Sequence, residues 1–194
     1  MTPDKLSGWA AAGALAVAVV AHAVPVNDEV DISVHVQQNG DRIVVAVDLP
    51  VHATAIETWN VMTDYDNMAK FVSNLQTSRI IERSGNKLIV MQKGKATRGL
   101  LSFSFENVRE IMLTPPTEVR SRLISGDLVA SEFTTRVVDH GDSSQIVNQG
   151  EFIPKVWVPP IIGPAVIEAE TRKQFQQLRT EILRRKAETA ASRQ

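Results

Sequence analysis

The sequence contains no cysteine. Chemistry that depends on a thiolate is therefore excluded, including cysteine nucleophiles, cysteine-ligated zinc and iron–sulfur clusters. The absence of disulfides is compatible with export. A chain of 194 residues with 43% hydrophobic residues can be held together by one apolar core, and it is short for two domains.

The chain also lacks a charge excess and the common catalytic motifs. Its formal net charge is -1, whereas a nucleic-acid-binding surface needs a basic stripe. None of its 4 histidines lies at metal-ligand spacing from another, and HExxH is absent. No GxGxxG, GxxxxGK[ST] or GxSxG motif is present, so the glycines indicate turns. We therefore expect no metal, no cofactor and no nucleic-acid partner.

An apolar run, AAAGALAVAVVAHA, follows a short polar lead. It is shorter than the ~20 residues that span a membrane comfortably. It ends in Ala21-His22-Ala23, which fits a signal-peptidase site. Residues 1–23 are therefore predicted to be a cleaved signal peptide, leaving a periplasmic or secreted protein. The alternatives are an uncleaved anchor and a wrongly assigned start codon, because Asp4 offsets Lys5 in the lead.

The remaining sequence alternates as β-strands do. Residues 30–37 and 41–49 alternate apolar and polar side chains on either side of Asn39-Gly40, which predicts a hairpin. Residues 24–41 are thus a leading segment with an extra strand. Thr54 and Glu57 have capping-box spacing, and in the short helix that follows Ile56 and Trp59 share one side. Further strands are expected over 77–82, 87–93, 100–113, 118–125, 128–138 and 145–152.

A long helix closes the chain. It is predicted to begin near Gly163-Pro164, and residues 188–194 are predicted to be a disordered tail. An apolar stripe follows helical spacing along it: Ile167, Thr171, Phe175, Leu178 and Ile182. The stripe serves core packing, or part of it also lines a ligand cavity. The order of elements predicts an α+β domain over residues 42–187, with a curved antiparallel sheet around the helix.

Residues 49–83, LPVHATAIETWNVMTDYDNMAKFVSNLQTSRIIER, carry a family pattern through Trp59, Thr63-Asp64-Tyr65-Asp66 and Phe71. With SGDLVASEFTTRVV (125–138) and FIPKVWVPPIIGPAVIEAETRKQFQQLR (152–179), they resemble the START-like (SRPBCC) superfamily of polyketide cyclase/dehydrase and lipid-transport domains. The chain looks closest to the coenzyme-Q-binding-protein-like branch. The resemblance implies a helix-grip fold with two short helices after the first core strand. It also favours a structural role for Asp64-Tyr65-Asp66 over a catalytic one.

Three functions remain open. The leading one is binding of a hydrophobic small molecule or lipid between the sheet and the C-terminal helix, in a carrier or chaperone role. The others are a polyketide cyclase/aromatase-like enzyme and a partner-binding domain without a ligand. A carrier is compatible with transient membrane contact; the oligomeric state is not predicted. The proposed cavity lining is Trp59, Phe71, Met91, Phe103, Phe105, Arg109, Phe133, Phe152, Trp157 and Phe175.

Arg109 stands out in that set, because it falls in the apolar phase of its strand. Burying an unpaired charge is costly, so either the strand bends there or the cation anchors a ligand headgroup. In the neighbouring strands, Arg120, Arg122, Glu132 and Arg136 lie in the polar phases. They are expected to face solvent, with an electrostatic docking site as the alternative.

Overall fold

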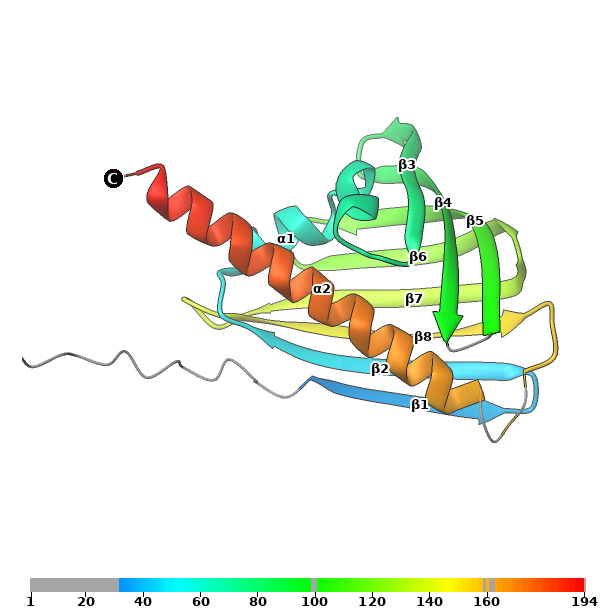
Figure 1. Ribbon diagram of the computed structural model, residues 1–194. Coiled ribbons are helices and arrows are strands. Elements are labelled where there is room, and N and C mark those ends of the chain that lie inside the picture. Colours follow the sequence, from blue (N-terminus) through cyan, green and yellow to red (C-terminus); the bar gives the residue numbers. More distant parts are fainter. Residues whose placement is uncertain (1–31, 99–100, 159, 161–162, 194) are drawn as a thin grey trace, which may run out of the picture.

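The computed structural model describes residues 32–98, 101–158, 160 and 163–193, without the side chains of 96–98 and 101–103. The predicted signal peptide and its cleavage site lie outside the described residues. The remainder forms one antiparallel sheet in the order β1-β2-β8-β7-β6-β5-β4-β3, crossed on one face by a long helix (Figure 1). The strands are β1 (Ser33–Asn39), β2 (Arg42–Val51), β3 (Leu75–Ser84), β4 (Lys87–Arg98), β5 (Leu101–Thr114), β6 (Glu118–Gly126), β7 (Leu128–Asp139) and β8 (Ser144–Pro154).

The leading strand pairs within the chain. β1 lies against β2 along its whole length, from Ser33↔Asp48 to Asn39↔Arg42. Gly40 in the connecting turn has φ +67, a conformation that glycine adopts without steric cost. The predicted hairpin is confirmed, and β1 is one edge of the sheet.

The core lies between the helices and the β1–β2–β8 half of the sheet. Alternate residues of β2 are at most 3% exposed, because side chains of a strand point alternately to its two faces. Ile146 of β8 is fully buried beside Leu49, its cross-strand partner. On the other half of the sheet, Leu88 of β4 and Ile111 of β5 form a second fully or nearly fully buried pair.

Helix α1 (Ala55–Met62) begins with the predicted capping box. Thr54 Oγ1 accepts a hydrogen bond from the Glu57 amide, and Glu57 Oε2 accepts one from the Thr54 amide at 2.9 Å. Trp59 is buried but Ile56 is 53% exposed, so the two residues that helical spacing places on one side do not share a buried side. Thr58 takes the inward position instead, with Oγ1 2.8 Å from Ser144 Oγ. A 3-10 helix, η1 (Tyr65–Lys70), follows.

Helix α2 (Gly163–Ala191) packs against β1, β2 and α1. Leu178 and Ile182 of the predicted stripe are buried, and Ile167 and Phe175 are partly buried against the core. The helix continues to Ala191, beyond residue 188, from which the sequence predicts a disordered tail. A capping signal is missing there, and helical propensity carries the chain onward. The α+β helix-grip architecture is confirmed (Figure 1).

Candidate functional site

The helix-facing side of β4 and β5 carries a cation. Arg109 is paired across the ladder with Val90, whose side chain is 2% exposed, and cross-strand partners share a face. The ladder with β6 shifts register between Val108 and Arg109. The strand is therefore irregular next to Arg109, and the cation nevertheless points inward.

Arg109 is electrostatically unusual. Its Nε is buried and has no hydrogen-bond partner among the described residues. Burial lowers the pKa of Arg109, an effect partly offset by Tyr65. Burial also raises the pKa of Tyr65 well above its ordinary value, against the opposing influence of Arg109. The site therefore holds a neutral tyrosine hydroxyl near a guanidinium, and arginine stays protonated in proteins.

Further polar groups lie on the same side of the sheet. Gln92 is the cross-strand partner of both Ser78 and Asn107. Its Nε2 donates to Ser78 Oγ at 3.2 Å, and Asn107 Oδ1 accepts from the Asp127 amide at 3.2 Å. Asn74 Oδ1 is buried without a partner among the described residues. Strand pairing brings Ser78, Gln92 and Asn107 together, which no local motif in the sequence predicts.

Aromatic side chains cover glycines on the neighbouring strands. A Cβ added to Gly94 would lie 2.4 Å from Phe105 Cζ, and one added to Gly150 would lie 2.4 Å from Phe133 Cδ1. Each pair is in cross-strand register, so both rings lie on the helix-facing side. Three more of the predicted lining residues are partly buried and pack against the core from this side: Phe71, Phe152 and Phe175.

Other predicted lining residues lie elsewhere. Met91 pairs with Arg79 and Val108 and therefore lies on the outer face, opposite Val90. Trp59 is 6% exposed within the core, and Trp157 is 78% exposed. Phe103 belongs to β5, but its side chain lies outside the described residues.

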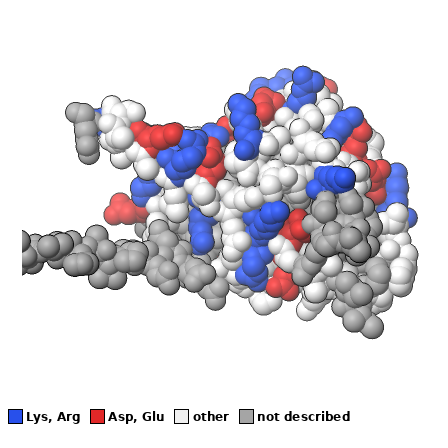
Figure 2. All heavy atoms as spheres, viewed as in Figure 1, with Lys and Arg blue, Asp and Glu red and all other residues white. Residues whose placement is uncertain are grey.

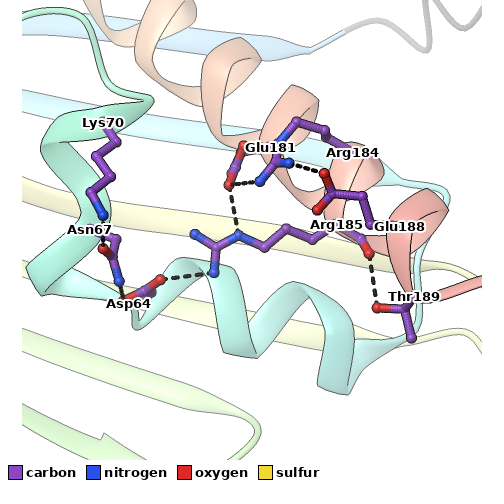
Figure 3. Close-up of polar contacts among 8 residues, drawn as sticks. All are labelled: Asp64, Asn67, Lys70, Glu181, Arg184, Arg185, Glu188 and Thr189. Atoms are coloured by element: carbon purple, nitrogen blue, oxygen red, sulfur yellow. Dashed lines mark hydrogen bonds and ion pairs between the residues drawn. The ribbon is translucent and has the colours of Figure 1, made fainter. Parts of the chain in front are cut away.

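The two carboxylates of the Asp64-Tyr65-Asp66 cluster have separate partners. Asp64 does not cap η1; its Oδ1 accepts from Asn67 and its Oδ2 from Arg185 Nη1, both at 2.8 Å (Figure 3). Asp66 Oδ1 accepts from the amide of Ile80 at 2.7 Å. These contacts join η1 to α2 and to β3, which is a structural role, and they leave no convergent carboxylate pair.

A polar network extends from this contact along α2 (Figure 3). Hydrogen bonds from Arg184 hold the pKa of Glu181 at about 2, with burial opposing and Arg185 adding to the effect. The Arg185 guanidinium also lies 5.8 Å from the centroid of the Phe71 ring. The network borders an open hollow of about 410 Å³ that Asn67 and Lys70 also line.

A smaller hollow of about 230 Å³ brings together two histidines that the sequence analysis treats as separate. His52 follows β2, and His140 precedes β8 with Nε2 3.3 Å from Gln145 Oε1. Within the described ranges, no three His, Cys, Asp or Glu side chains are grouped so as to hold a metal ion.

Charged residues on the outer sheet face pair with one another in solvent. Glu110 contacts Lys87 and Arg122, and Glu118 contacts Arg120 and Arg136. The three arginines are at least half exposed, as the polar phase predicts. On the helix side, Figure 2 likewise shows basic and acidic groups interspersed rather than a basic stripe.

Exposed apolar side chains gather at one end of the sheet, which we call the β6–β7 tip. It consists of the end of β6, the Gly126-Asp127 turn, the start of β7 and the segment after β8. Lys155 Nζ donates to the Gly126 carbonyl at 2.6 Å, which holds the turn and the segment after β8 together. Its apolar side chains are 52% to 78% exposed: Ile124, Val129, Val156 and Trp157.

Comparison with solved structures finds the same fold at low sequence identity. The aromatase/cyclase Zhui from Streptomyces sp. R1128 has a TM-score of 0.63 at 15% identity, over 74% of this chain and 95% of that one. A START superfamily protein from Mycobacterium smegmatis has 0.63 at 14%, over 73% and 97%. The STAR-related lipid transfer protein from Xanthomonas axonopodis (fragment 25-204) has 0.64 at 11%, over 78% and 93%.

A search among curated proteins finds no match. The family described as "Polyketide cyclase / dehydrase and lipid transport" matches residues 42–188, which include every described strand except β1 and nearly all of α2. The resemblance carried by the segment around Trp59 and Phe71 is thereby confirmed. The match covers well over half of the chain. The chain therefore belongs to the polyketide cyclase/dehydrase and lipid-transport family of START-like domains.

Proposed function

We propose that this protein binds an amphipathic small molecule or lipid between α2 and the helix-facing side of β4 to β8, and carries it after export. The observation that supports this most is the buried Nε of Arg109, which lacks a partner among the described residues. A buried donor without a partner costs free energy, so its retention on a core-facing strand calls for a group that it binds.

The apolar part of the ligand would lie against the aromatic residues. Phe133, Phe152 and Phe175 are only partly buried although they face the core, whereas Ile43 and Ile146 on the same side are fully buried. The incomplete burial marks the part of the helix-facing side that the described residues leave partly exposed. Apolar walls with a few polar groups are typical of small-molecule sites.

The polar part of the ligand would meet Arg109. A carboxylate, phosphate or carbonyl oxygen would accept the Nε hydrogen bond, and a charged acceptor would make that bond stronger. Tyr65, held neutral by burial, is a second donor close enough to influence Arg109. The ligand class is therefore an apolar body with one oxygen-bearing, preferably anionic, end.

Native mass spectrometry of protein purified from its export compartment tests this proposal. We expect a bound mass on the wild type, its loss in Arg109→Met, and its retention in Arg79→Met. Arg79 is exposed on the outer face and serves as the matched control. The proposal fails if the wild type carries nothing under any purification condition, or if both variants retain the ligand equally. The mass of the chain itself also tests cleavage after Ala23.

Transient membrane contact is part of the carrier proposal. The β6–β7 tip exposes Trp157, and tryptophan favours membrane–water interfaces. In the part of the chain that the structure describes, no helix is long and apolar enough to cross a membrane. Flotation with vesicles of mixed zwitterionic and anionic lipids should recover the wild type and lose Trp157→Ala. Equal recovery of both excludes this surface.

The electrostatic coupling of Tyr65 and Arg109 also supports a second candidate, a cyclase-like enzyme. Arg109 would stabilise negative charge that develops on a carbonyl oxygen of a bound chain, as a preorganised donor does. The two candidates differ in what leaves the protein. A carrier releases its ligand unchanged, whereas an enzyme releases a product of altered structure, and extraction of the released molecule followed by mass spectrometry distinguishes them.

A further inference from the structure

Within the described part of the chain, the outer edge of β1 lacks the charges, prolines and bulges that usually protect an edge strand. β1 is terminal in the sheet order, so only β2 pairs with it among the described residues. Its sequence, SVHVQQN, contains no charged residue and no proline. Edge strands commonly carry charges, prolines or bulges, because their free backbone groups otherwise pair with another strand.

The opposite edge of the same sheet has these protections. β3 carries Arg79, Glu82 and Arg83, and its ladder with β4 shifts register twice. The two edges therefore differ in the devices that prevent strand addition. β1 also lies outside the family match, which begins at residue 42, so its open edge is an addition to the family domain.

The register defines which groups β1 presents. Asn39 and Arg42 close a two-residue turn, and in such hairpins the closing pair is hydrogen-bonded. Alternation along the ladder then directs the backbone N–H and C=O of Val34, Val36 and Gln38 away from β2. These residues offer a row of donors and acceptors along the free edge.

We propose that β1 pairs antiparallel with β1 of a second copy, about a two-fold axis at Val36. An antiparallel pair is self-complementary, as a two-fold interface requires. In this register Val34 lies opposite Gln38 of the partner subunit, and His35 lies opposite Gln37 of the partner subunit. The two eight-stranded sheets become one continuous sheet.

A second copy fits this edge better than an unrelated strand does. The exposed side chains next to the axis, His35 and Gln37, carry no formal charge with histidine neutral, so two copies meet without like-charge repulsion. Helix α2 packs over the helix-facing side of β1, where Arg172 Nη1 donates to the Ile32 carbonyl at 2.5 Å. The helix thus packs on one face of β1, and its Arg172 contact is to the carbonyl of Ile32, which precedes the row formed by Val34, Val36 and Gln38.

Light scattering after gel filtration of the exported chain, in a concentration series reaching about 100 µM, tests the proposal. We expect a dimer. The double variant His35→Lys/Gln37→Lys places lysines opposite each other twice across the axis and should weaken dimerisation about tenfold or more. The matched variant His35→Lys/Gln37→Glu restores opposite charges and should dimerise as well as the wild type. Both positions are exposed on the outer face, so neither variant disturbs the core.

A proline pair separates backbone pairing from side-chain effects. Val36→Pro removes an outward N–H, which an edge strand tolerates, and should give a monomer with unchanged circular dichroism. Ile81→Pro lies at the register shift of β3 and should leave the dimer intact. A wild-type monomer at the highest concentration overturns the proposal. Equal dissociation of the two charge variants, or a dimer insensitive to both, overturns it as well, whether or not Val36→Pro folds.

Discussion

If Arg109 binds a ligand, replacing it with methionine should raise the stability of the ligand-free protein and weaken ligand binding. Methionine keeps the length of the aliphatic stem and removes the buried Nε that has no partner among the described residues. Leaving a buried donor unsatisfied costs about 1–3 kcal/mol. The ligand-free variant should therefore gain about that amount in free energy of unfolding.

The gain is measurable by urea unfolding of ligand-free protein, followed by circular dichroism. For a chain of this size each kcal/mol corresponds to roughly 2–4 °C in the melting temperature. Arg79→Met, on the exposed outer face, should stay within about 0.5 kcal/mol of the wild type. The slope of the free energy against urea should not change, because the surface exposed on unfolding is the same.

The opposite result refutes the reasoning. A loss of more than about 1 kcal/mol in Arg109→Met would mean that the guanidinium has a structural partner, since breaking a buried polar contact destabilises. The cation would then stabilise the fold, and its burial would no longer support a ligand site. If Arg109→Met is more stable and still binds the ligand, then the unpaired Nε destabilises the fold without binding the ligand. The ligand site then lies elsewhere.

Three further predictions concern the fold around the site. Glu181→Gln should lower the free energy of unfolding at neutral pH, because the folded pKa of about 2 lies below the ordinary 4.5. The ionised Glu181 therefore stabilises the wild-type fold by on the order of 3 kcal/mol at most. This stabilisation is present above pH 4.5 and is lost as the pH falls through 2. Acid titrations of both proteins should therefore converge towards pH 2, and parallel curves would contradict the assignment. Gly150→Ala places a Cβ 2.3 Å from the Glu132 carbonyl oxygen, so thermal unfolding should show a loss of about 1–3 kcal/mol, and an unchanged melting temperature would contradict the close packing. Thr54→Ala removes the capping box and should cost about 1 kcal/mol in urea unfolding, unlike Ile56→Ala at an exposed position of the same helix.

Local signals in the sequence were sufficient where the physics is local. The alternation in residues 42–49, the turn at Gly40 and the Thr54–Glu57 capping box each involve residues a few positions apart. Their structures agree with the prediction, because side-chain period, glycine conformation and capping hydrogen bonds do not depend on distant parts of the chain.

Predictions failed where both faces of an element are apolar. Ile89 and Met91 alternate with Leu88 and Val90 in β4, so hydrophobicity alone does not say which pair faces the helix. The ladder decides it, since Val90 pairs with Ile80 and Arg109 on the helix-facing side. In α1, the apolar pattern alone does not show that Ile56 is exposed. Thr58 is buried in its place because its hydroxyl bonds Ser144 from β8, a residue distant in the sequence.

The sequence by itself determined the order of strands and helices, the turns, and the family to which the chain belongs. Only the tertiary structure decided that Arg109 lies inside near Tyr65, that Asp64 contacts Arg185, and that the Phe105 and Phe133 rings cover glycines. These contacts join residues far apart in the chain, so they depend on strand register and on the position of α2 against the sheet. Backbone preferences act over a few residues, whereas a site is built from whichever side chains the sheet brings to one face.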